Sequence, residues 1–216
     1  MRNIQSLIDE ALLAEKREDK IPTSWHPSAL GKCLCGVYLQ RMGVKPDREL
    51  NSRVRRVFKM GNLVEEFIVE NIKKVAKIEE QVRIVIPEYD VTGYCDFVIE
   101  TENGKEVIEV KSQHSQSFWW MEKKGQGAYE HHENQLWLYL HALKIERGSL
   151  IYVSKDDLCI LQYDVMYDTP RIKERVEEKI NILKTAWETK VPPPPAEKGT
   201  FQQKYCDFHQ QCQQTI

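Results

Sequence analysis

The spacing of apolar side chains divides the chain into helical stretches and β-strands. Apolar residues recur every three or four positions in five stretches, which predicts a helix in each. These stretches are residues 4–17, 28–42, 47–77, 128–145 and 170–189. Short runs of β-branched residues lie before and after the fourth stretch, and such runs are typical of strands. The expected strands are residues 82–87, 91–100, 105–112, 149–155 and 157–165.

Turn-forming residues fit this division. Asn103–Gly104 stands between two β-branched runs and predicts a hairpin there. Four consecutive prolines at 192–195 predict a stiff spacer after the last helix. Helices before, within and after a group of strands favour an α/β fold with a mixed central sheet. We expect an N-terminal helix over 1–23, a core over 24–190, and a spacer with a short cysteine-containing segment over 191–216.

Composition narrows the class of protein. The 216 residues are 41% hydrophobic and 30% charged, with a formal net charge of −2. These values suit a soluble globular protein and exclude a polycation that coats nucleic acid, so any nucleic-acid contact must come from a local patch. No apolar run approaches the roughly 18 residues of a membrane span, so no membrane partner is expected. The amphipathic, acidic N-terminus does not resemble a secretory leader.

Three charged residues on two neighbouring strands give the first chemical signal. Glu109 and Lys111 share one face of their strand, because side chains alternate along a strand. The predicted hairpin brings Asp96 close to Glu109. Two carboxylates beside a lysine are costly to bury, and a divalent cation offsets that cost because it prefers oxygen ligands. Taken alone, however, the three residues are more typical of the solvated face of a hairpin.

Two further groups favour a functional site. Glu65 lies four residues after Gly61 on the helix before the strands, from which it can reach a metal. Its neighbour Glu66 is the alternative ligand. Gln135 and Tyr139 are at positions i and i+4 of the helix after Lys111, so they share a face and can act together on a nucleic-acid strand.

The six cysteines fall into two kinds. Without a leader, metal binding or burial is favoured over disulfides. Cys95 and Cys159 lie inside apolar runs, where buried thiols are expected. The other four form two pairs near opposite ends of the chain, at Cys33, Cys35, Cys206 and Cys212.

The ordered motifs resemble those of the RecB-type nucleases of the PD-(D/E)XK superfamily. They are Gly61-x-x-x-Glu65, Gly93-x-x-Asp96, Glu109-Val-Lys111 and Gln135-x-x-x-Tyr139. The resemblance implies a restriction-endonuclease-like core with Mg²⁺ or Mn²⁺ as cofactor. It implies metal ligation by Glu65, Asp96, Glu109 and the Val110 carbonyl. It also implies that Lys111 is the catalytic lysine and that Gln135 and Tyr139 contact DNA.

The cysteine pairs resemble the iron–sulfur ligands of many such nucleases, including CRISPR-associated spacer-acquisition nucleases. There, one cysteine precedes the core and three follow it as C-x2-C-x5-C. Cys33 matches the first, and Cys206 and Cys212 match the last two. Gln203 stands where the middle cysteine is expected.

The fourth ligand is therefore open. Cys35 can supply it, and His209 is another candidate. Four such ligands suit a [4Fe–4S] or [2Fe–2S] cluster, with Zn²⁺ as the alternative. Either metal centre would join the N- and C-terminal segments around the core.

Basic and aromatic residues indicate where DNA would bind. Between residues 45 and 59, six basic residues outnumber two acidic ones. We expect Arg53, Arg55 and Arg56 to track phosphates toward the metal. A loop after Lys111 carries aromatic and basic residues that suit stacking on unpaired bases, although Phe118 and Trp120 fit a core equally well. These residues are Phe118, Trp119, Trp120, Lys123 and Lys124.

The sequence thus predicts a metal-dependent DNA exonuclease or end-processing enzyme acting on single-stranded or frayed DNA. The competing hypothesis is an inactive DNA-end-binding module of a larger nucleic-acid-processing complex. Glu65 keeps that hypothesis open, because the family usually has histidine there. The Gln135 helix and terminal cysteines disfavour a sequence-specific restriction enzyme. DNA and other DNA-processing proteins are the expected partners, in the cytoplasm of a prokaryotic cell or phage-infected host.

Overall fold

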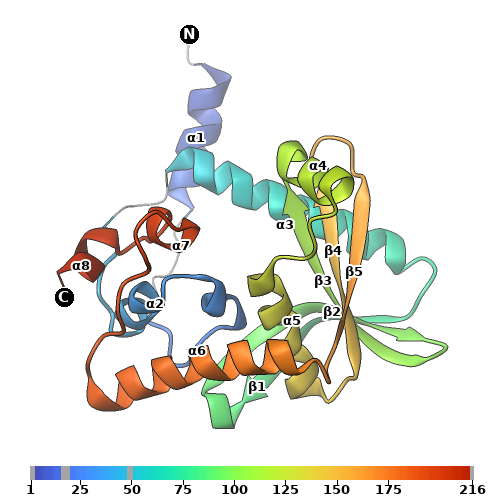
Figure 1. Cartoon of the computed structure of the whole chain (residues 1–216). Helices are drawn as coiled ribbons and strands as arrows, with labels where there is room; N and C mark the ends of the chain where they lie inside the picture. The colour runs from blue at the N-terminus through green and yellow to red at the C-terminus, as the bar shows by residue number, and fades with distance from the viewer. Residues whose placement is uncertain (1–2, 16–19, 48–50, 215–216) are drawn as a thin grey trace.

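Figure 1 shows the computed structural model of the protein, in which residues 3–15, 20–47 and 51–214 are described. One sheet has its strands side by side in chain order, and only β3 and β4 are parallel. The strands are β1 (Ile78–Ile86), β2 (Val91–Thr101), β3 (Gly104–Gln113), β4 (Arg147–Ser154) and β5 (Ile160–Met166). A parallel pair needs a crossover. Helices α4 (Ser115–Lys124) and α5 (Glu130–Leu143) supply it.

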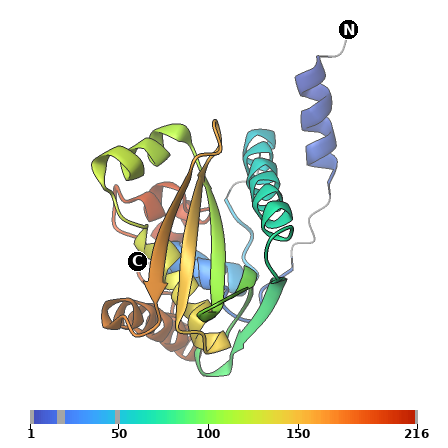
Figure 2. The same cartoon turned by 90° about the vertical axis from the view of Figure 1, so that its right-hand side faces the viewer.

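Helices cover both faces of the sheet (Figure 2). α3 (Ser52–Ile72) lies along one face, where Val64 and Ile68 belong to a cluster with Phe97 and Val110. α5 covers the other face and buries every residue from 134 to 140, so it is a core helix. α6 (Pro170–Thr189) packs against α5 from outside.

The two ends of the chain lie near each other. The 3₁₀ turn η1 (Pro27–Gly31) and α2 (Leu34–Arg41) pack against α5 and α6. The C-terminal helices α7 (Phe201–Lys204) and α8 (His209–Gln213) return beside α2 (Figure 1). α1 (Ile4–Ala14) stands away from this body and contacts α3, and it buries none of its residues. Among the described helices, none is both long and apolar enough to cross a membrane.

The mixed α/β fold with helices around a central sheet is confirmed, with local differences. Residues 115–124 form α4, where the sequence predicted a loop. Phe118 and Met121 face the core one turn apart, and Gly125 ends the helix at a φ of 64°. Cys95 is fully buried as predicted. The prediction for Cys159 is wrong: its thiol is exposed, because the residue lies in the turn just before β5.

Candidate active site and metal centre

β2 and β3 separate at the acidic residues. The hairpin ladder runs from Thr101–Gly104 to Phe97–Ile108, and Asp96 is the next residue of β2. Asp96 Oδ2 accepts a hydrogen bond from the Val110 N–H at 2.7 Å. The carboxylate thus satisfies a strand N–H that the ladder no longer pairs. This bond holds Asp96 beside Glu109, as the hairpin predicts.

A hydrogen-bonded network surrounds Glu109, which is 2% exposed. Lys111 Nζ donates to Glu109 Oε1 at 2.6 Å and to Gln135 Oε1 at 3.2 Å. Gln135 Nε2 donates to Glu109 Oε1 at 2.7 Å and to the Tyr139 hydroxyl at 2.8 Å. Gln135 and Tyr139 are themselves buried. Their direct contact with DNA stays a prediction. In the structure, Gln135 holds the Glu109 carboxylate, and Tyr139 in turn holds Gln135.

Glu65 approaches this network from α3. It is half-buried, and its Oε1 accepts a hydrogen bond from Gln81 Nε2 at 2.9 Å, whereas Glu66 is exposed. Gln81 is a residue that sequence reasoning missed. Its φ of 47° is rare for a residue with a side chain, and it lies on β1 opposite Asp96, outside the paired ladder. No sequence signal marks it, because the β-branched run begins at the next residue.

The electrostatics reflect three carboxylates around one lysine. Burial raises the pKa of Asp96, and the charges of Glu109 and Glu65 raise it further. Burial and the Glu109 charge likewise raise the pKa of Glu65. Burial acts to lower the pKa of Lys111, but the surrounding carboxylates outweigh it and the net pKa is raised. Lys111 therefore stays protonated, while one lysine cannot compensate three carboxylates.

The oxygens of Glu65, Asp96 and Glu109 are of the kind that a divalent cation prefers, but they do not all lie within 4.8 Å of one another as the three cysteine sulfurs do. Glu109 Oε2 is buried and lacks a hydrogen-bond partner among the described residues. An uncompensated carboxylate oxygen in such a place is costly. The charge of Glu65 raises the pKa of Asp96, and the charge of Glu109 raises the pKa of both, so the three carboxylates act on one another electrostatically. Val110, whose carbonyl is the fourth predicted ligand, lies on the same strand between Glu109 and Lys111.

The basic patch has a different arrangement from the one expected. Arg55 Nη1 donates to the backbone carbonyls of Leu12 at 2.6 Å and Glu15 at 3.0 Å. Arg56 forms an ion pair with Asp9. Two of the three predicted DNA-binding arginines thus hold α1 against α3, and Arg53 is exposed.

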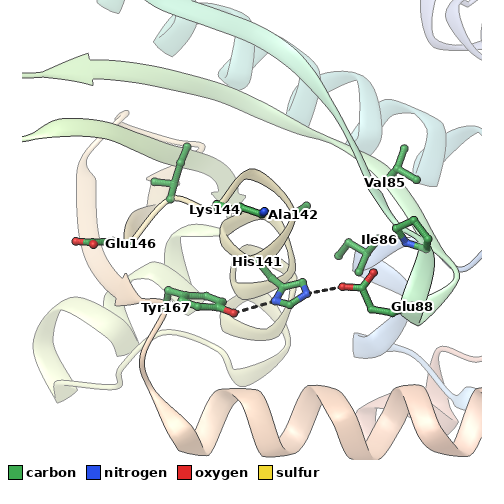
Figure 3. Close-up of a pocket in the computed structure, with 10 residues that line it drawn as sticks. Val85, Ile86, Glu88, His141, Ala142, Lys144, Glu146 and Tyr167 are labelled. Carbon is green, nitrogen blue, oxygen red and sulfur yellow. Dashed lines mark hydrogen bonds and ion pairs between the residues drawn. The ribbon is translucent and has the colours of Figure 1, made fainter.

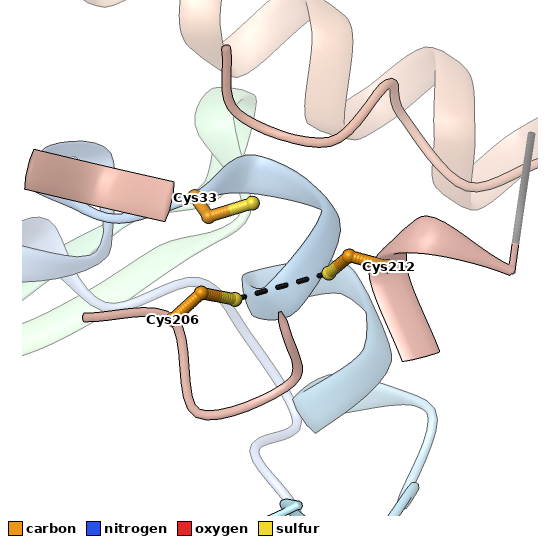
Figure 4. Close-up of side chains that lie close together, drawn as sticks. All are labelled: Cys33, Cys206 and Cys212. Atoms are coloured by element: carbon orange, nitrogen blue, oxygen red, sulfur yellow. Dashed lines mark hydrogen bonds between the residues drawn. The ribbon is translucent and has the colours of Figure 1, made fainter. Parts of the chain in front are cut away.

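Three cysteines from both ends of the chain converge (Figure 4). The Sγ atoms of Cys33, Cys206 and Cys212 all lie within 4.8 Å of one another, and the three residues are buried. Gly36 on α2 makes room for them, because a Cβ there would lie 2.9 Å from Cys206 Sγ. The Ala196 N–H donates to Cys33 Sγ at 3.3 Å and draws the chain after the prolines into the cluster.

Cys35 and His209 lie around this trio. Cys35 is buried, and its hydrogen bond with Cys212, together with burial, raises the pKa of Cys212. The hydrogen bond from Cys206 lowers the pKa of Cys33 to about 5. His209 lines an adjacent cavity of about 260 Å³. Such a cluster fits a thiophilic metal centre, because a metal replaces several protons that the thiols otherwise keep.

A larger cavity, of about 660 Å³, lies at the C-terminal end of α5 (Figure 3). His141 bridges Glu88 and Tyr167 there, with Nε2 2.9 Å from Glu88 Oε1 and Nδ1 3.0 Å from the Tyr167 hydroxyl. None of the predicted site residues lines it. This cavity is therefore separate from both predicted sites.

Comparison with known proteins places the chain in a family. The model of the PD-(D/E)XK nuclease superfamily matches residues 10–213. The chain belongs to this superfamily. The resemblance predicted from the motifs is thereby confirmed, and so is the restriction-endonuclease-like character of the sheet and its flanking helices.

Individual PD-(D/E)XK relatives are more distant. The CRISPR-associated exonuclease Cas4 of Saccharolobus solfataricus is 31% identical over 106 residues, which cover 47% of this chain and 48% of that protein. The match therefore spans about half the length of that relative. The structure of SSO0001 covers 100% of this chain and 98% of its own, with a TM-score of 0.61 and 21% identity.

LHK-Exo, an alkaline exonuclease from Laribacter hongkongensis, covers 86% of this chain and 93% of its own, with a TM-score of 0.57 and 15% identity. At these identities the solved structures support the fold.

Proposed function

We propose that this chain is a divalent-metal-dependent DNA exonuclease or end-processing enzyme for single-stranded or frayed DNA. The grouping of three carboxylates and Lys111, with a buried Glu109 oxygen that has no hydrogen-bond partner in the described part of the chain, carries the proposal. Membership of the PD-(D/E)XK nuclease superfamily supports it, as do two relatives whose names describe exonucleases.

Glu65, Asp96, Glu109 and the Val110 carbonyl would hold Mg²⁺ or Mn²⁺. A divalent ion at these oxygens supplies positive charge that lowers the pKa of water and stabilises an anionic transition state. Lys111 lies beside Glu109 and Gln135, where its Nζ can orient the attacking water or donate to a phosphate oxygen. Two of its three N–H groups serve Glu109 and Gln135, and the third is available to a phosphate oxygen as charge grows there.

The cysteine centre would be an iron–sulfur cluster, [4Fe–4S] or [2Fe–2S], with Zn²⁺ as the alternative. Cys33, Cys206 and Cys212 would supply three thiolates, and Cys35, which hydrogen-bonds Cys212, would supply a fourth. The centre would join the chain ends and lies outside the carboxylate network. Anaerobic purification followed by absorption spectroscopy and iron and zinc analysis tests this assignment.

The deciding experiment is cleavage of end-labelled single-stranded DNA with Mn²⁺, Mg²⁺ or EDTA. Wild type should degrade it only with a metal, and Glu109→Ala should not degrade it. Glu65→Gln and Glu66→Gln form a matched pair, because only Glu65 is half-buried beside the site. Loss in Glu65→Gln alone supports the ligand assignment. DNA binding without cleavage by wild type under any metal would favour the end-binding module.

A further inference from the structure

The helix after the lysine strand has an exposed aromatic and basic face. α4 buries Phe118 and Met121 and leaves Trp119 and Trp120 each 44% exposed. At about 100° per residue, Gln116, Trp119, Trp120 and Lys123 lie opposite Phe118 and Met121, and Lys124 lies at the edge of that arc. This α4 face consists of Gln116, Trp119, Trp120, Lys123 and Lys124, all exposed.

The two exposed tryptophans differ from the others in the chain. Trp137 is fully buried, and Trp25 and Trp187 each lie 4.2 Å from the Arg41 guanidinium and contact each other edge to face. Trp119 and Trp120 contact each other edge to face, with ring centroids 5.1 Å apart. Each ring thus leaves 44% of a large apolar surface in contact with water, and this part gains nothing from folding.

The charge of the α4 face is complementary to a polyanion. The Lys124 ammonium lies 5.6 Å from the Trp119 ring and 5.9 Å from the Trp120 ring, so it keeps positive charge beside both. Glu122 is the single acidic residue of α4, and it forms an exposed pair with Lys123 that contributes little. Aromatic rings interleaved with lysines are the chemistry that binds unpaired nucleic acid.

Position relates this face to the carboxylate site. Glu109 and Lys111 point to the α5 side of the sheet, where they bond Gln135. α4 lies on the same side, because Phe118 shares a core cluster with Leu136 of α5. Three residues lie between Lys111 and the start of α4, so the chain between them spans at most roughly 13 Å. That length corresponds to roughly three or four stacked nucleotides.

We propose that the α4 face binds unpaired bases of the substrate strand, a few nucleotides from the carboxylate site. The inference rests on the proposed function and deepens it. Bases stack on Trp119 and Trp120, while Lys123 and Lys124 attract the adjacent phosphates. Every base has a π face, so the contact tolerates sequence. A duplex keeps its base faces stacked internally, so the same rings discriminate unpaired from paired DNA.

The first test is binding in EDTA, which does not require cleavage. Fluorescence anisotropy would measure a labelled oligo(dT) and a blunt duplex against three doubly substituted proteins. These are Trp119→Ala/Trp120→Ala, Trp119→Phe/Trp120→Phe, and the control Phe201→Ala/Tyr205→Ala. The control removes another exposed ring pair, 4.6 Å between centroids, from α7 in the cysteine segment.

We expect the alanine variant to bind oligo(dT) about 10- to 100-fold more weakly, because each stacked base contributes substantially. The phenylalanine variant should lose less affinity for oligo(dT), and the control variant should bind oligo(dT) as wild type does. The affinity for the duplex should be the same in all of these proteins. Unchanged melting temperatures would show that folding is intact. Equal oligo(dT) affinity in wild type and the alanine variant would overturn the inference, as would equal loss in the control, which would favour a nonspecific surface effect.

The second test places the contact along the strand. Oligonucleotides with one abasic position would be cleaved in Mn²⁺, moving that position stepwise from the scissile phosphate. Wild type should slow most at roughly three or four nucleotides, and the alanine variant should show no such position. A uniform profile in wild type would overturn the placement. No cleavage at all would count against the proposed nuclease, while the binding test would still decide the α4 face.

Discussion

The carboxylate site and the cysteine site both gather like groups from distant parts of the chain, but different interactions keep them together. Around the carboxylates, Lys111, Gln135 and the Val110 N–H supply charge and hydrogen bonds. The three thiols of Cys33, Cys206 and Cys212 have mainly one another. The first site thus has partners within the fold, whereas the proposed metal would supply the main partner of the second. Damage to the first should cost activity, and damage to the second should cost stability.

The largest expected effect is the loss of catalysis in Lys111→Ala. Removing the ammonium takes away the donor for the phosphate and should lower single-turnover cleavage by about 10²- to 10³-fold or more. Measured in Mn²⁺, the melting temperature should change little, because the bound cation offsets the carboxylate charge that Lys111 otherwise compensates. Full activity would contradict the assigned role. A large loss of stability would instead contradict the contrast between the two sites.

The next largest effect should be on stability, in Cys33→Ser. The metal centre closes a loop of about 170 residues between Cys33 and Cys206, and opening a loop of this size costs on the order of 3–5 kcal/mol. Denaturant unfolding and the absorption spectrum would measure the loss. Cys159→Ser is the matched control, because that thiol is exposed. Equal unfolding midpoints for wild type and Cys33→Ser would contradict the proposal that a metal centre at Cys33 stabilises the fold.

A smaller effect should appear as pH dependence at the edge of the carboxylate site. Burial, with the Lys111 charge, lowers the pKa of His132 from 6.5 to about 2. Below pH 6.5, His132 is therefore protonated in the unfolded chain but stays neutral in the folded chain. The contribution of His132 to the free energy of unfolding is fully present above pH 6.5. As the pH is lowered below 6.5, this contribution decreases by at most about 1.4 kcal/mol per pH unit.

Urea unfolding at pH 7.5, 6.5 and 5.5 would measure this slope. His132→Gln should have a shallower pH dependence than wild type, and the exposed His114→Gln should match wild type. Identical slopes for wild type and His132→Gln would show that His132 does not titrate as described.

The smallest effect should come from Arg56→Ala. Its ion pair with Asp9 is half-exposed, so losing it should cost less than about 1 kcal/mol. The salt dependence of oligo(dT) binding distinguishes two roles for Arg56, which are holding α1 through Asp9 and contacting a DNA phosphate. If Arg56 only holds α1, the slope stays that of wild type. A slope smaller by about one unit would restore Arg56 to the DNA-binding surface.

The parts of the site that follow from local rules could be predicted. Side-chain alternation and the Asn103–Gly104 turn place Asp96 beside Glu109, and both are properties of a few adjacent residues. The helical period likewise locates α3, α5 and α6.

Other features depend on contacts between distant segments, and no local pattern indicates them. In the sequence, Gln135 looks like a surface residue of its helix. In the structure it is buried, because its side chain completes the hydrogen-bonded network around Glu109. Arg55 and Arg56 look available to DNA until α1 packs against them. α4 was missed because its exposed tryptophans hide the spacing of Phe118 and Met121.

The hydrogen bond between Asp96 and the Val110 N–H has an evolutionary consequence. Asp96 meets two demands at once, since it offers oxygen at the carboxylate site and closes the fork between β2 and β3. A descendant that lost cleavage and kept only DNA binding would no longer need Lys111. It would still need an acceptor at position 96, and asparagine could serve. Among related sequences, drift at Lys111 with Asp or Asn retained at 96 would therefore mark lineages that kept the fold after losing the chemistry.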